Sequence, residues 1–152
     1  MNKKEEFMKE ALKEAKKAFN KNEVPIGAVI VKDNIVIAKA HNLRETKNMS
    51  IAHAEVLAIE KACKKLNSWR LNDCDIYVTV EPCPMCAGAL LNSRIRKLYF
   101  GTTDQKSGAV VSNLNELDLS KTFCNHKVEY EGDVLACDCK AILQDFFAEL
   151  RK

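Results

Sequence analysis

Two short groups of residues combine side chains that bind a transition metal with one that can carry protons. The first is the His-x-Glu of residues 53–55, and the second, thirty residues later, is the Pro-Cys-x-x-Cys of residues 82–86. One imidazole and two thiols suit zinc better than magnesium or calcium. Structural zinc sites close with four protein ligands, whereas three leave a position for water. The pattern therefore predicts one zinc per chain, held by His53, Cys83 and Cys86.

Glu55 is the carboxylate that the sequence ties to these ligands. Two thiolates cancel the charge of Zn²⁺, so this metal should acidify its water less than an all-histidine site does, and a helper base is needed. Glu55 would take the proton of the water and pass it to the substrate. Taken singly, His53 could be a core histidine, Glu55 a first-turn acid and the cysteines a redox dithiol. Their joint occurrence favours the metal site.

The elements that position these groups follow from hydrophobic periodicity. The sequence predicts helices over residues 4–20, 52–66, 84–92 and 134–150, strands over 26–31, 35–40, 75–80, 97–101 and 127–131, and mainly loop over 102–125. Alternating strands and helices imply a mixed, mostly five-stranded sheet between helix layers. We therefore expect a three-layer α/β/α sandwich in a single domain, residues 1–152.

Both metal-binding groups fall at predicted helix starts. Pro84 suits the first helical position because it has no N–H to leave unpaired. The positive end of the helix dipole favours the thiolate form that metals need. Side chains tilt back toward the start of a helix, so those of residues 53–55 can converge beyond its end.

Composition narrows the remaining function classes. A net charge of +3 is too small to identify a nucleic-acid binder, and no stretch approaches the length of a membrane span. We expect a soluble, cytoplasmic protein without membrane contact. Seven cysteines without a secretory signal indicate reduced thiols. Cys124, His126, Cys137 and Cys139 could form a second zinc site, but residues 137 and 139 should point apart at a helix start.

The metal-binding groups match the signature of zinc nucleobase deaminases. Beyond them, the chain resembles the bacterial tRNA-specific adenosine deaminases of the cytidine-deaminase superfamily along almost its whole length. The matching segments are residues 23–28, 41–44, 68–71, 81–88, 92–95 and 125–129, with two phenylalanines and an arginine near the end. The resemblance implies a cytidine-deaminase-like fold, a homodimer, and hydrolysis of adenosine to inosine and ammonia at the anticodon wobble position of tRNA, with the target base flipped out.

The resemblance also implies roles for residues outside the metal-binding groups. Asn42 would hydrogen-bond the purine, Pro25, Ile26 and the backbone of Ala54 would shape the pocket, and Asp104 would lie beside the flanking nucleotides. The candidate contacts to the RNA stem-loop are basic or aromatic: Arg44, Arg70, Arg94, Lys106, Phe146, Phe147 and Arg151. Their alternatives are ordinary surface charge and, for the phenylalanines, core packing.

Two segments depart from the family pattern. Met49-Ser50-Ile51 stand where the family usually has Asp-Pro-Thr, which affects the loop that enters the metal-binding helix. Val110 and Val111 lie in a loop where the family often has an additional glycine, whose conformational freedom β-branched residues lack. Altered contacts to flanking nucleotides are therefore expected.

Two other functions stay open. One is a deaminase of a free base or nucleoside such as guanine, cytosine or cytidine, which would use the same chemistry without RNA. The other is a non-catalytic, zinc-stabilised RNA-binding module, against which Glu55 beside a three-ligand site argues.

Overall fold

The computed structural model describes residues 2–113, 115–119 and 126–151, and within them the elements follow the predicted order. The helices are α1 (Lys3–Asn20), α2 (Ala54–Leu66), α3 (Pro84–Asn92) and α5 (Ala136–Leu150), with a 3₁₀ helix η1 (Glu116–Leu119). The strands are β1 (Gly27–Lys32), β2 (Ile35–His41), β3 (Cys74–Val80), β4 (Lys97–Thr102) and β5 (Glu129–Glu131).

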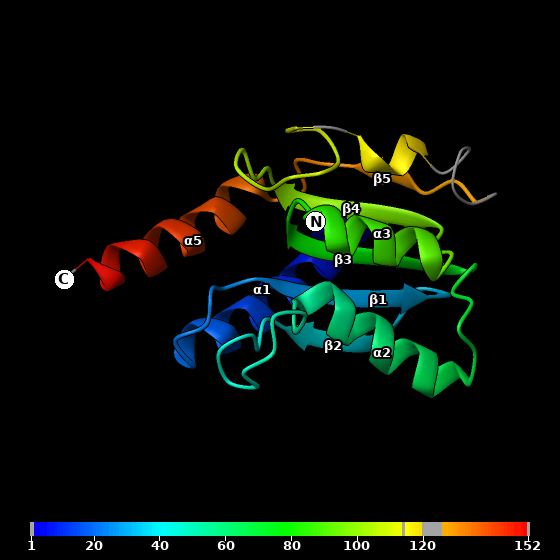
Figure 1. Ribbon diagram of the computed structural model, residues 1–152, viewed down its shortest axis with the longest axis horizontal. Coiled ribbons are helices and arrows are strands. Elements are labelled where there is room, and N and C mark those ends of the chain that lie inside the picture. The colour runs from blue at the N-terminus through cyan, green and yellow to red at the C-terminus, as the bar shows by residue number, and fades with distance from the viewer. Residues whose placement is uncertain (1, 114, 120–125, 152) are drawn as a thin grey trace.

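The five strands form one mixed sheet in the order β2-β1-β3-β4-β5 (Figure 1). β1 runs antiparallel to β2 and to β3, whereas β3, β4 and β5 are parallel. Asp33 and Asn34 form the β1–β2 turn with φ angles of 52° and 63°, a left-handed conformation that these residue types tolerate in a tight hairpin. The predicted mixed, five-stranded sheet is confirmed.

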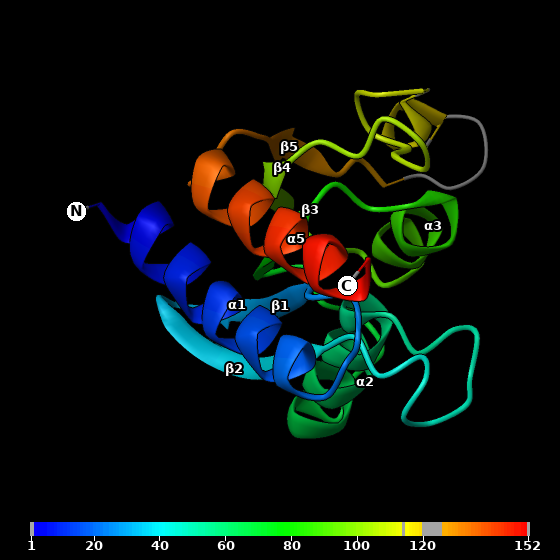
Figure 2. The same ribbon diagram turned by 90° about the vertical axis from the view of Figure 1, so that its left-hand side faces the viewer.

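Helices cover both faces of this sheet, with α1 and α5 on one side and α2 and α3 on the other (Figures 1 and 2). Successive strand residues point to opposite faces, and β1 supplies both cores. Val29 and Val31 pack in the cluster that includes residues of α1, whereas Ala28 and Ile30 pack in the cluster that includes residues of α2. The predicted three-layer sandwich is therefore confirmed.

Gly27 allows α1 to lie directly against the start of β1. A Cβ atom there would overlap the carbonyl oxygen of Ala11 and lie 2.5 Å from the amide nitrogen of Ala15. Any larger residue would push the helix away from the sheet. The loop that joins α1 to β1 is thereby held over the end of the sheet, where it contributes to the pocket described below.

The structure corrects several predicted boundaries. α2 begins at Ala54 and not at residue 52, because His53 has extended backbone angles (φ −77°, ψ 153°) and occupies the N-cap position. α5 begins at Ala136, after Leu135 with a φ of 53°. The stretch predicted as loop contains η1, and the fifth strand is shorter than predicted. Within the described residues, we find no helix long and apolar enough to cross a membrane.

Candidate active site

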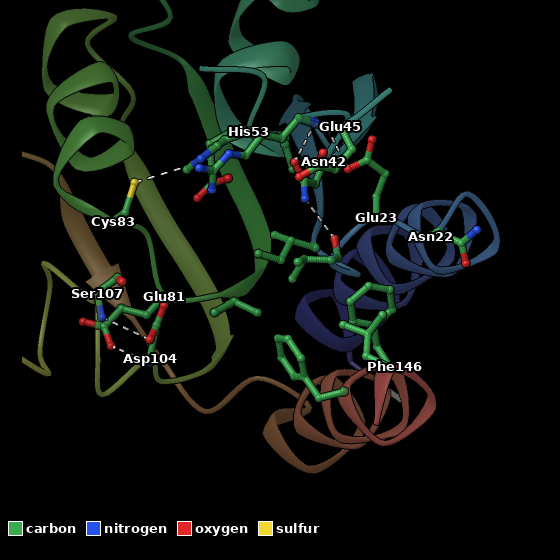
Figure 3. A pocket seen from close by; sticks show the side chains of 18 residues that line it. Asn22, Glu23, Asn42, Glu45, His53, Glu81, Cys83, Asp104, Ser107 and Phe146 are labelled. Carbon is green, nitrogen blue, oxygen red and sulfur yellow. Dashed lines mark hydrogen bonds between the residues drawn. The ribbon is translucent and has the colours of Figure 1, made fainter. Parts of the chain in front are cut away.

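His53, Cys83 and Cys86 converge at the N-termini of two neighbouring helices. His53 is the N-cap residue of α2 and Cys83 the N-cap residue of α3, and within the described residues neither side chain caps its own helix. His53 Nδ1 lies 3.6 Å from the Sγ of Cys83 and 3.5 Å from the Sγ of Cys86 (Figure 3). The three ligand atoms all lie within 4.8 Å of one another. The predicted ligands are thus brought together by the fold.

These distances fit a tetrahedral zinc ion. Bond lengths of about 2.3 Å to sulfur and 2.0 Å to nitrogen give a nitrogen–sulfur edge of about 3.5 Å. Both nitrogen–sulfur distances in the cluster, 3.6 and 3.5 Å, agree with that edge. The donor set also suits zinc, and three protein ligands leave one tetrahedral position for a water.

The cluster favours a thiolate, which is the form that binds a metal. Hydrogen bonds from the Cys86 thiol and from His53 outweigh burial and lower the pKa of Cys83 to about 4. The same hydrogen bond to Cys83, together with burial, raises the pKa of Cys86. The hydrogen bond to Cys83 also raises the pKa of His53. The start of α3 adds a positive potential at these sulfurs.

Glu55 lies in the first turn of α2, two residues beyond His53, and only 4% of it is exposed. Burial, reinforced by the negative potential of Cys83, raises its pKa to about 7. A carboxyl group with a pKa near neutrality can both accept a proton and return it. The position and environment of Glu55 therefore suit the predicted proton carrier.

The cluster opens into a pocket of about 460 Å³. Its walls come from the α1–β1 loop, the β2–α2 loop, the loop that follows β4, and the last turns of α5. Figure 3 shows His53 and Cys83 on one side of the pocket and Phe146 of α5 on the opposite side. The volume lies within the range that holds small ligands, and it would accommodate a nucleobase with part of its sugar.

Four of the five predicted substrate-binding residues line this pocket, namely Asn42, Ile26, Ala54 and Asp104. Pro25 is buried and is not among the described residues that line the pocket. The Asn42 side chain is held in place, because its Nδ2 donates to the carbonyl oxygen of Val24 at 3.3 Å and its Oδ1 accepts from the amide of Arg44 at 3.1 Å. An amide nitrogen carries two hydrogens, so Asn42 has a second donor with which to bind a base.

Asp104 also shapes its own loop. Its Oδ1 accepts hydrogen bonds from the backbone amides of Lys106 and Ser107, each at 3.1 Å. Such a side-chain turn fixes the backbone locally. Asp104 therefore has a structural role in addition to its place in the pocket wall.

The candidate RNA contacts divide into two groups in space. Arg44, Phe146 and Phe147 line the pocket, and Phe147 also lines a neighbouring groove along α5 together with Arg151. Lys106 is exposed next to the lining residue Ser107. The two phenylalanines differ, because Phe146 is 5% exposed and packs against Phe19, with ring centroids 5.8 Å apart, whereas Phe147 is 41% exposed.

Arg70 and Arg94 form the second group, far from the metal ligands. Their guanidinium carbons lie 4.6 and 5.7 Å from the ring centroid of Trp69, which is 54% exposed. They follow the C-terminal ends of α2 and α3, whereas His53 and Cys83 precede the N-terminal ends. A helix of 13 residues such as α2 is about 20 Å long, so this group lies at the other end of the sheet.

Two buried glutamates in the pocket wall, Glu23 and Glu81, were not predicted from the sequence. Glu23 accepts hydrogen bonds from the backbone amides of Glu45 (3.1 Å) and Thr46 (2.6 Å). Glu81, only 3% exposed, accepts several from the loop that follows β4. Both glutamates lie in segments that resemble the family, and this resemblance was the one signal in the sequence that could have identified them. Their partners are backbone amides distant in sequence, which no side-chain pattern reveals.

The two departures from the family pattern leave the cluster intact. In the first, the carbonyl oxygen of Met49 accepts from the amide of Ala52 at 3.1 Å, and the turn is followed by His53, whose Nδ1 lies 3.6 Å from the Sγ of Cys83. In the second, Val110 and Val111 are not among the described residues with positive φ. The loop of this chain therefore does not require a glycine's conformational freedom at either position.

A second metal site does not form among the described members of its predicted ligand set. Cys137 is exposed and Cys139 fully buried, so they point apart as predicted, and His126 Nε2 lies 2.7 Å from the carbonyl oxygen of Ile95. Cys124 lies outside the described residues. Across residues 2–113, 115–119 and 126–151, the one cluster that could hold a metal is that of His53, Cys83 and Cys86.

A His-Cys-Cys cluster with an adjacent glutamate that is not a ligand is the arrangement of the zinc nucleobase deaminases. A family model described as MafB19-like deaminase matches residues 1–151. The tRNA-specific adenosine deaminase of Bacillus subtilis (strain 168) is 53% identical over 146 residues, which cover 96% of this chain and 89% of that protein. The chain belongs to the tRNA-specific adenosine deaminase family, within the MafB19-like deaminases.

Two solved deaminase structures are similar to this chain. One from a study of A-to-I editing by tRNA:A34 deaminases at the wobble position of transfer RNA has a TM-score of 0.85 and 43% identity, covering 91% of this chain and 99% of its own. A guanine deaminase from Bacillus subtilis has a TM-score of 0.64 and 44% identity, covering 68% of this chain and 66% of its own. A deaminase of a free base can therefore be closely similar in sequence over a shorter region.

Proposed function

We propose that this chain is a zinc-dependent hydrolase that converts adenosine to inosine at the wobble position of a tRNA anticodon and releases ammonia. One observation carries the proposal: the His53, Cys83 and Cys86 cluster and buried Glu55 lie in a pocket whose wall also contains Arg44 and Phe147. The first four supply chemistry on a base, whereas the arginine and the half-exposed ring suit the phosphate and base of a polynucleotide. The names of two similar proteins, a tRNA-specific adenosine deaminase and a tRNA:A34 deaminase, support the same substrate.

In the proposed reaction, three residues bind the metal and a fourth transfers protons. His53, Cys83 and Cys86 would hold zinc, which when bound supplies a Lewis acid that makes a water more acidic. Glu55 takes one proton from the attacking water and delivers it to a ring nitrogen of the base. It then takes the second proton, from the hydroxyl now bonded to the base, and hands it to the amino group; the C–N bond breaks as the carbonyl forms, so that adenosine and water become inosine and ammonia.

Asn42 orients the base in this pocket through its amide, which the bonds to Val24 and Arg44 hold in place. Phe146 closes the side opposite the ligands and limits the entry of bulk water (Figure 3). A base can reach this depth only if it leaves its stack, and an unpaired loop nucleotide does so at the lowest cost. An anticodon loop meets that condition.

The proposal includes further properties, of which the family resemblance implies the homodimer and the sequence itself the others. These are one zinc per chain, a homodimer, action in the cytoplasm where tRNA is used, and a single deaminase domain over residues 1–152. Arg44, Lys106, Phe147 and Arg151 would contact the anticodon stem-loop close to the pocket. Arg70 and Arg94 would contact RNA at a second place, beside Trp69.

A deaminase of free guanine is the second candidate, because a guanine deaminase is 44% identical to this chain over 68% of its length. The non-catalytic module is disfavoured, since the chain belongs to a deaminase family and Glu55 lies in the pocket.

The test is a comparison of substrates. The protein is incubated with an anticodon stem-loop that bears wobble adenosine and, separately, with free adenosine, cytidine, cytosine and guanine, and inosine and ammonia are measured. Binding energy from flanking nucleotides should make kcat/KM for the stem-loop at least ~10²-fold higher than for free adenosine. Faster turnover of guanine or cytosine than of the stem-loop would overturn the tRNA assignment in favour of the second candidate.

A further inference from the structure

Glu81 lies directly after β3 and two residues before the Cys83 ligand, and its carboxylate points into the loop that follows β4 (Figure 3). One oxygen, Oε2, accepts hydrogen bonds from the backbone amides of residues 110, 111 and 112, at 3.0, 2.7 and 3.0 Å. The other, Oε1, accepts from the amide of Asp104 at 3.1 Å and from the hydroxyl of Ser112. A single buried carboxylate thus binds five donors from one loop.

That loop, residues 103–112, forms one wall of the active-site pocket through Asp104 and Ser107. It is also joined to the metal-binding segment by a backbone bond, in which the amide of Ala109 donates to the carbonyl oxygen of Pro82 at 2.9 Å. Gly108 packs so tightly that a Cβ there would overlap the Glu81 carboxylate. The loop is therefore folded around this one side chain.

We propose that Glu81 is a positioning residue, whose carboxylate sets the loop of residues 103–112 at a fixed place relative to Cys83 and thereby aligns the RNA-contacting wall with the metal cluster. The inference rests on the proposed function, because it assigns the loop to recognition of nucleotides that flank the target. Glu81 does not touch the reacting atoms in this account. It acts through Asp104, Lys106 and Ser107.

Only a carboxylate satisfies these donors. An ionised carboxylate offers two acceptor oxygens and no hydrogen, whereas an amide offers one oxygen and an NH₂ that would face backbone N–H groups. If Glu81 loses one acceptor oxygen, the buried N–H groups of the loop that donate to it are left unpaired. The free-energy cost of these unpaired donors is larger than the stabilisation that the hydrogen bonds contributed. The loop would then relax, while the ligands on α2 and α3 keep their helix positions.

The experiment compares Glu81→Gln with Asp75→Asn, a matched carboxylate-to-amide change on β3. Asp75 bonds Arg96 at 2.9 and 3.1 Å at the other end of that strand. For each zinc-loaded protein we would measure zinc content, Tm, and kcat and KM for the stem-loop. A positioning role predicts normal zinc in Glu81→Gln, a KM raised roughly tenfold or more, and a kcat per bound zinc that changes much less. Asp75→Asn should keep the wild-type KM.

A milder variant tests the same inference if Glu81→Gln does not fold. Ser112→Ala removes one of the five donors and should raise KM by about two- to fivefold with zinc and Tm near wild type. A lower kcat per zinc with unchanged KM in the folded variants would mean a structural role only and would overturn the inference. A wild-type protein that does not deaminate the stem-loop would overturn the proposed function. If the wild type is active and KM is unchanged in these variants, the positioning role of Glu81 is wrong and the proposed function stands.

Discussion

Glu55→Gln separates the chemistry from the binding of metal and RNA. Glutamine has nearly the same size and hydrogen-bonding reach as glutamate, but it cannot accept and return a proton. Glu55 is 4% exposed and lies two residues from the His53 ligand, so bulk water is poorly placed to replace it. Loss of a general acid–base group costs at least ~10²-fold in rate, about 2.7 kcal/mol of transition-state stabilisation.

The assay is single-turnover formation of inosine in the stem-loop, with zinc content and stem-loop affinity measured on the same preparation. We expect one zinc per chain and an affinity within about threefold of wild type. Burial already disfavours the charged carboxyl, as its pKa of about 7 indicates, so the neutral amide should not lower Tm. Glu60→Gln, on the exposed side of α2, is the control and should keep full activity. A rate for Glu55→Gln close to wild type would refute the proton-carrier role.

Three further predictions concern the metal, the RNA and stability. Cys83→Ser should lose zinc and lower Tm, because α2 and α3 meet at the cluster; retained stoichiometric zinc would contradict the ligand assignment. Arg44→Ala should reduce the slope of log affinity for the stem-loop against log salt by about one, and an unchanged slope would exclude a phosphate contact. Burial raises the pKa of Glu23, but hydrogen bonds from Thr46 and Glu45 outweigh it and leave the pKa below its usual 4.5. The ionised form therefore stabilises the fold above pH 4.5 and this contribution fades as the pH falls through the folded-state pKa. Glu23→Gln should accordingly lower the free energy of unfolding by roughly 1–3 kcal/mol at pH 7 and by less near pH 3 in urea titrations; an equal loss at both pH values would falsify the argument.

The metal cluster could be predicted from the sequence because each ligand stands beside a helix start. His53 and Cys83 are N-cap residues, and the side chains at two neighbouring helix ends meet without help from distant loops. The predicted start of α2, residue 52, lies two residues before the observed start at Ala54. Histidine is not a usual capping residue, so nothing in its type marked the boundary.

The pocket wall could be predicted only in part. Asn42, Ile26, Ala54 and Asp104 were expected from the family resemblance, not from periodicity, and all four line the pocket. The roles of Glu23 and Glu81 depend on backbone amides of loops that are distant in sequence. Hydrophobic patterns describe which face of an element is buried, and they carry no information on where a loop directs its N–H groups.

Basic residues were the least predictable part of the site. Arg44 lies in the pocket wall, whereas Arg70 and Arg94 lie beside Trp69 beyond the opposite ends of the helices. From residue type alone, all three arginines were candidate RNA contacts. Their separation follows from the directions of α2 and α3, which become definite only when the helices are packed on the sheet.

The most direct test of the central claim is the position of inosine in natural tRNA. A pool of unmodified tRNA is treated with the protein or with Glu55→Gln, and inosine is read as guanosine after reverse transcription and sequencing. We expect conversion at the wobble position of tRNAs that carry adenosine there, with other adenosines unchanged and no conversion by the variant. Wobble adenosine that stays unconverted, under conditions in which the same preparation deaminates a free base, would contradict it.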